Sequence, residues 1–237
     1  MNCEASCFIS NMERLKHLSL KECTHVTATG IAEILRKLPG LQAIAGCEVL
    51  GEALTVLYDK WLSRHPKKSI PTRLCLQEVL GAGQVSENEL WLITEHCADI
   101  KKIGLEYRTR SSKENSSGAH LPDLAPLTTL KHLDYLVVSA AALYTHSLHH
   151  VLVHRGAGLV HLELHGVDEV CLDSMVLLGQ HCRLLTYLAI CDCYYTAAVT
   201  DRVRLELACT SKVRTSFLPS PAKPKLQPQL GTAQLQL

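Results

Sequence analysis

The chain has 237 residues, of which 47% are apolar and 20% are charged. That length suits one large domain or two small ones with a substantial core. The formal net charge of +1 lacks the strongly basic character of proteins that bind nucleic acid or anionic membranes. We therefore expect neither kind of partner.

The N-terminal sequence and the cysteines indicate the cellular compartment in which the protein is expected. The first twenty residues lack the basic start and apolar run of a secretory signal. The 11 cysteines, an odd number, are typical of unpaired thiols in a reducing environment, so we expect a cytoplasmic or nuclear protein. The most membrane-like stretch, residues 133–153, contains Asp134 and three histidines, so we expect a soluble protein with no membrane span.

Short segments of one pattern recur along the chain. Each follows the order apolar, two variable, apolar, one variable, apolar, as in LKHLSL from Leu15 and LVHLEL from Leu159. The seven copies begin at residues 15, 41, 71, 100, 130, 159 and 185, in steps of 26 to 30 residues. The copy from Pro71 is the weakest, because its first apolar position is lost. This interval predicts one short strand in each unit.

Helix-like stretches lie between the short segments. Residues 24–40 carry apolar residues at helical spacing and end in a Pro-Gly pair. Residues 85–97 open with Ser86 and Glu89 at the spacing of a capping box, and residues 169–182 repeat the design. One unit is therefore predicted to be a strand, a turn, a helix and a return.

The form LxxLxLxxC…VTxxGI of residues 15–31 resembles the cysteine-containing leucine-rich repeats of F-box/LRR proteins and of their relatives without an F-box. The resemblance covers about residues 12–193. It implies an α/β leucine-rich repeat solenoid of about seven repeats of 26–30 residues, with a curved parallel sheet inside and helices outside. Pro71, Arg108 and a polar insertion at residues 108–123 depart from the pattern.

Four segments follow from this pattern. We expect an N-terminal segment at 1–11, a repeat domain at 12–195, a degenerate last repeat or cap at 196–212, and a disordered tail rich in Pro and Gln at 213–237. The resemblance implies a role in choosing substrates for ubiquitin ligation, with ubiquitin-ligase components as partners. The few residues before the first repeat lead us to expect no F-box there. A stand-alone adaptor, a competitor, and an incomplete fragment or isoform of a larger repeat protein therefore stay open.

The repeat assigns different surroundings to neighbouring cysteines. Cys97 and Cys182 fall three residues before a strand segment, where most units carry an apolar residue, so we expect both to be buried. Cys23 and Cys193 take an eighth position that most other units fill with Val, and we expect burial there too. Cys191 falls in the outward-facing set and keeps a case for reactivity. These diverging thiols predict no zinc site.

Three histidines, His146, His150 and His154, follow one predicted helix face at intervals of four. That spacing can bind zinc, so a metal-binding protein is the lesser alternative. The segment holds no carboxylate and no HExxH motif, which favours a solvated helix face. Gly81 and Gly83 echo a dinucleotide-binding loop, but they are better explained by a turn. We find no nucleophile motif or paired catalytic carboxylates, and expect neither enzymatic activity nor a cofactor.

Strand alternation selects the side chains that face out from the predicted sheet. The polar and aromatic members of this set, which we expect to bind a protein ligand, are His17, Lys21, Arg73, Gln77, Lys102, Glu106, His132, Asp134, His161, Glu163, His165 and Tyr187. The same alternation places Cys47 and Leu136 in the outward set. Mixed charge with apolar patches suits a protein ligand better than a polyanion, so the sequence predicts a protein-interaction module.

Overall fold

The computed structural model describes residues 12–64, 74–83, 85–107, 123–140, 143, 145–167, 172–191 and 214–218. The strands are β1 His17–Ser19, β2 Ala43–Ala45, β3 Glu78–Ala82, β4 Lys102–Tyr107, β5 Tyr135–Ala140, β6 His161–His165, β7 Tyr187–Cys191 and β8 Arg214–Leu218. The helices are α2 Ala28–Lys37, α3 Leu50–Arg64, α4 Glu87–His96, η1 Ala125–Thr129, α5 Thr145–Arg155, η2 Gly156–Gly158 and α6 Leu172–His181.

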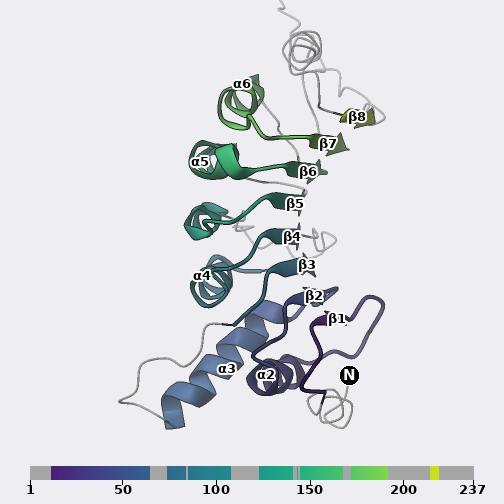
Figure 1. Cartoon of the computed structure of the whole chain (residues 1–237), viewed down its shortest axis with the longest axis vertical. Helices are drawn as coiled ribbons and strands as arrows, with labels where there is room; N and C mark the ends of the chain where they lie inside the picture. Colours follow the sequence, from purple (N-terminus) through teal and green to yellow (C-terminus); the bar gives the residue numbers. More distant parts are fainter. Residues whose placement is uncertain are drawn as a thin grey trace, which may run out of the picture.

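The strands form one parallel sheet whose order follows the chain from β1 to β8. A helical segment joins each strand from β1 to β6 to the next one, and consecutive helical segments contact each other. In Figure 1 the strands stand in one row and the helices in a second row beside it. The fold is therefore a parallel α/β arrangement in which, within the described part, the helices cover one face of the sheet.

Local sequence signals begin and end two of the helices. Thr27 caps α2 by accepting a hydrogen bond from the Gly30 backbone, and the basic last turn of this helix complements its dipole. The capping box predicted for α4 is confirmed: Ser86 N–H donates to Glu89 Oε2 over 2.7 Å, and Glu89 N–H donates to Ser86 Oγ over 3.3 Å.

One continuous core lies between the sheet and the helices. Helix α2 contributes Ile31 and Ile34, and the strands contribute Ile44, Ile103 and other inward side chains. The core extends along the stack from Leu20 to Ile190. Burial of these aliphatic side chains stabilises the fold by about 1.5–3 kcal/mol for each fully buried residue. Among the described helices, none has the length and apolar character that crossing a bilayer requires.

The strand register corrects two predicted units. One column of paired residues runs His17, Ala43, Glu78, Lys102, Tyr135, His161 and Tyr187. The third strand thus begins at Glu78 and not near Arg73, and the fifth begins at Tyr135 and not near His132. Both shifts are odd numbers of residues, so they exchange the inward and outward faces.

The reason for the error is an unequal spacing between strands. The prediction assumed a constant interval, but the connections before β3 and before β5 are longer than the others. The connection before β3 carries the fifteen-residue helix α3, and the one before β5 carries the polar insertion. Additional residues in loops cost little free energy, so a repeat can absorb them without losing strand pairing.

The predicted C-terminal tail also needs a correction. Strand β8 lies at Arg214–Leu218, inside the segment expected to be disordered, and pairs in parallel with β7. The expected N-terminal segment 1–11 and the expected cap 196–212 lie outside the described residues.

Candidate binding site on the open face of the sheet

The face of the sheet opposite the helices, called the open face below, carries every second strand residue. Burial alternates along β5 and β6, where Leu136, Val138, Leu162 and Leu164 are buried while the residues between them are half-buried. This alternation is the signature of a sheet with one packed face and one face toward solvent. The open face is therefore the surface on which polar side chains of successive strands can act together.

Three rings form a ladder across β5, β6 and β7. The Tyr135 and His161 ring centroids are 4.0 Å apart with planes inclined by 16°. The His161 and Tyr187 centroids are 4.2 Å apart at 8°. Parallel register places the three residues directly beside one another, so each ring stacks on the next. The ladder places a row of three stacked rings, one from each strand, on the open face.

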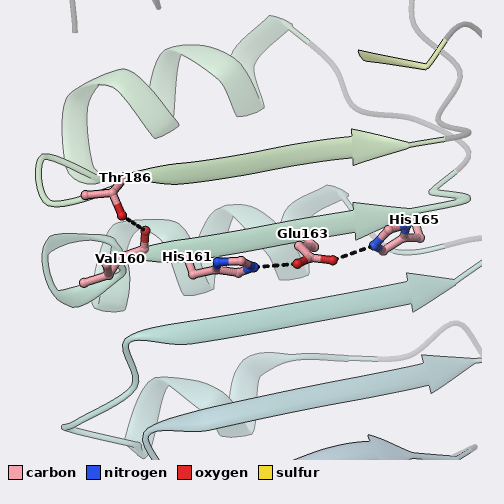
Figure 2. A network of polar contacts seen from close by, with 5 residues as sticks. All are labelled: Val160, His161, Glu163, His165 and Thr186. Atoms are coloured by element: carbon pink, nitrogen blue, oxygen red, sulfur yellow. Dashed lines mark hydrogen bonds and ion pairs between the residues drawn. The ribbon is translucent and has the colours of Figure 1, made fainter. Parts of the chain in front are cut away.

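Glu163 links two histidines of the same strand, as Figure 2 shows. His161 Nε2 donates to Glu163 Oε1 over 2.5 Å, and His165 Nε2 donates to Glu163 Oε2 over 2.9 Å. Burial acts to raise the pKa of Glu163, but the hydrogen bonds from His165 and His161 outweigh it and the pKa is lowered. Glu163 is therefore an ionised acceptor. Both imidazoles donate a hydrogen bond to it through Nε2.

The Tyr135 hydroxyl belongs to the same cluster. Its pKa is raised by burial and then by the charge of Glu163 and a hydrogen bond to that carboxylate. Tyr135 thus stays a neutral phenol, and Glu163 receives donors from two strands. The cluster holds the ladder rings in fixed orientations, because two of the three rings donate to one carboxylate.

One ion pair crosses from β3 to β4. Lys102 Nζ lies 2.7 Å from Glu78 Oε1, and the two residues are paired in the sheet register. The hydrogen bond to Glu78 is the main cause that raises the pKa of Lys102. Since both side chains are substantially exposed, this pair contributes surface charge more than stability.

The open face is hollowed between the region after β1 and strand β6. The hollow has a volume of about 670 Å³. It is lined by Leu20, Lys21, Glu22, Cys23, Thr24, Val26, Gly46, Glu48, Val49, Leu80, Gly81, Gly104, Glu106, Tyr135, Val137 and Glu163. The side chains therefore come from the region after β1 and β2 and from strands β3 to β6.

Three adjoining glycines shape the hollow. A Cβ placed on Gly81 would lie 3.5 Å from the Gly46 backbone nitrogen, and one on Gly104 would lie 3.4 Å from the Gly81 nitrogen. Gly46 and Gly81 have φ near +67° and +66°, a conformation that suits glycine. Gly81 also lies where the β3–β4 register shifts between Val79 and Ala82. The turn predicted at Gly81 is thus an irregularity within a strand.

The structure brings together several of the predicted site residues. Lys102, Glu106, His161, Glu163, His165 and Tyr187 lie on β4, β6 and β7, and His17 lies exposed on β1. Lys21 is exposed just beyond β1 and lines the hollow.

Other predicted residues fall off the strands. Gln77, His132 and Asp134 precede β3 and β5, where the backbones of Gln77 and Asp134 hydrogen-bond to neighbouring units. Leu136, expected to face outward, is 0% exposed because of the register shift. Arg73 lies outside the described residues.

Some of the predictions about cysteine burial are confirmed and others are wrong. Burial of Cys97 and Cys182 is confirmed. Cys23 is exposed, against the prediction, because it lies in the region after β1 that borders the hollow. Cys47, expected to face outward, is buried, because the chain turns inward at Gly46. Cys191 ends β7 opposite His165, and Cys193 lies outside the described residues.

The histidines of α5 follow one helix face. The rings of His146 and His150 are 6.3 Å apart, and those of His150 and His154 are 4.3 Å apart. His154 Nδ1 is hydrogen-bonded to the His150 backbone carbonyl. Across the part of the chain that the structure describes, no three His, Cys, Asp or Glu side chains converge to hold a metal ion.

Sequence reasoning missed Glu48, Glu78, Leu80, Tyr135 and Val137 on the open face. A signal for the fifth unit was present, because LDYLVV from Leu133 fits the repeat pattern as well as LKHLDY from Leu130 does. The nearly even interval between predicted units favoured the segment from Leu130, which is the wrong frame for the fifth strand. For the third unit, the frame from Leu76 lacks the last apolar residue, since Gly81 takes its place.

No family model matches the sequence, and no curated protein shows significant similarity to it.

Proposed function

We propose that the chain is a leucine-rich repeat solenoid that binds a protein ligand on its open face. The support for the repeat assignment is the strand order, which follows the chain, together with element contacts that join neighbouring units. Repeat proteins of this kind use their extended sheet surfaces for recognition. The resemblance to F-box/LRR proteins adds a narrower prediction, that the ligand is a substrate for ubiquitin ligation.

The observation that carries this proposal is the ring ladder beside the hollow. Tyr135, His161 and Tyr187 are aligned and held half-buried on the face opposite the described helices. Aromatic residues fixed in place before binding lose little conformational entropy on contact with a partner, and tyrosine is enriched where few residues carry most of the binding energy. An open sheet that served only as a solvated surface would not need a stacked ladder.

The test is proximity labelling in cells with two matched double variants. The first, His161→Ala with Tyr187→Ala, removes one imidazole and one aromatic ring from the open face. The second, His154→Ala with Trp91→Ala, removes the same two kinds of side chain from exposed positions on α5 and α4. We expect the first variant to lose specific partners while the second keeps them. If both variants keep the same partners, the open face is not the binding surface.

A further inference from the structure

The hollow in the open face is acidic, and we infer that it binds an extended segment of the ligand carrying arginine or lysine side chains. This inference deepens the proposed function and rests on it. It names the chemistry of the ligand, which the ladder does not.

The charges of the hollow differ from those of the whole chain. Its lining holds the carboxylates of Glu22, Glu48, Glu106 and Glu163 against the ammonium of Lys21, a formal charge of −3, whereas the chain as a whole carries +1. These carboxylates come from four different units of the fold and converge only in the tertiary structure. A surface of one sign attracts a ligand segment of the opposite sign and disfavours an acidic one.

The shape of the hollow suits an extended backbone. Gly46, Gly81 and Gly104 adjoin one another, so no side chain rises from this part of the sheet. The hollow extends from the region after β1 to β6, which is about five strand spacings or about 24 Å. A fully extended segment of about seven residues spans that distance.

The apolar lining fits the same ligand class. Leu80, Val49 and Val137 lie in the hollow with the carboxylates. Arginine and lysine place their aliphatic stems on such surfaces while their charged ends reach polar partners. Guanidinium groups also pair with two carboxylate oxygens at once, which adds geometric specificity. The combination of aliphatic and acidic lining therefore favours long cationic side chains over short ones.

The test measures fluorescence polarisation of a labelled eight-residue peptide of alternating arginine and serine, added to the purified full chain. The comparison peptide carries neutral citrulline at each arginine. We expect the arginine peptide to bind about tenfold more tightly, and its affinity to fall as salt is raised. Equal affinity for the two peptides would overturn the inference.

Three variants locate the binding. Glu106→Gln removes one charge from the hollow and should weaken the arginine peptide about fivefold. Glu95→Gln removes one charge from an exposed position on α4 and should leave the affinity unchanged. Gly104→Val should abolish binding by filling the hollow, since a Cβ at Gly104 meets its neighbours at ordinary contact distances of 3.4 Å and more. Circular dichroism checks that each variant is folded.

Two outcomes would refute the hollow as the binding site without refuting the proposed function. Equal weakening by Glu106→Gln and Glu95→Gln would mean nonspecific attraction and would refute the hollow as the site. A dimer in sedimentation that Gly104→Val converts to a monomer would mean that a second copy covers the hollow, which also refutes it. In either case the labelling experiment with His161→Ala and Tyr187→Ala still tests the proposed function, because those residues lie outside the hollow's lining.

Discussion

Leu136 distinguishes the two possible frames of the fifth unit. In the even-interval frame its side chain faces solvent, whereas in the structure it is 0% exposed and packs in the continuous core. Leu136→Ala should therefore remove a fully buried isobutyl group and leave a cavity. Replacing a core leucine with alanine costs about 2–5 kcal/mol in the free energy of unfolding. Val137→Ala, at the next position on the open face, should cost about 1 kcal/mol or less.

Urea unfolding monitored by circular dichroism measures both variants against the parent chain. A loss of about 2–5 kcal/mol is a large part of the stability of a typical domain, about 5–15 kcal/mol, so the Leu136→Ala transition should move to much lower urea. The refuting result is a Leu136→Ala loss no greater than that of Val137→Ala. That outcome would return the fifth strand to the frame that begins at Leu130.

Three further predictions concern stability. His96 is 7% exposed and stacks on Tyr58 at 3.7 Å, and burial, opposed by the charge of a neighbouring glutamate, lowers its pKa below the usual 6.5. Below pH 6.5 the unfolded chain therefore binds a proton that the folded chain does not, so the stability should be full above pH 6.5 and fall below it. His96→Phe should flatten this pH dependence of the melting temperature. A melting temperature that depends on pH as steeply as in the parent chain would contradict the prediction. Ser86→Ala should cost about 1 kcal/mol in urea unfolding by removing the capping box, and a neutral effect would count against the cap. Gly46→Ala should cost more than about 1 kcal/mol, because φ is +67° and the new Cβ would lie 2.7 Å from a backbone nitrogen; a stable variant would refute this conformation.

The parts of the fold that the sequence predicted correctly depend on local signals. The strands of the first, second, fourth, sixth and seventh units lie in the predicted frame, because each has a clear apolar pattern. The capping box of Ser86 and Glu89 depends on residues three apart and was equally visible. Among the residues of the open face, His161, Glu163 and His165 were predicted correctly because they alternate on one strand.

The sequence alone therefore determined the alternation of strands and helices and most of the outward side chains, because periodicity is a local property of the chain. The tertiary structure decided the register of β3 and β5, because pairing with neighbouring strands fixes which residue follows a long connection. It also decided which distant residues meet. Tyr135 joins the ladder, and Glu48, Glu106 and Glu163 line one acidic hollow, only because parallel pairing places separate units about 4.8 Å apart.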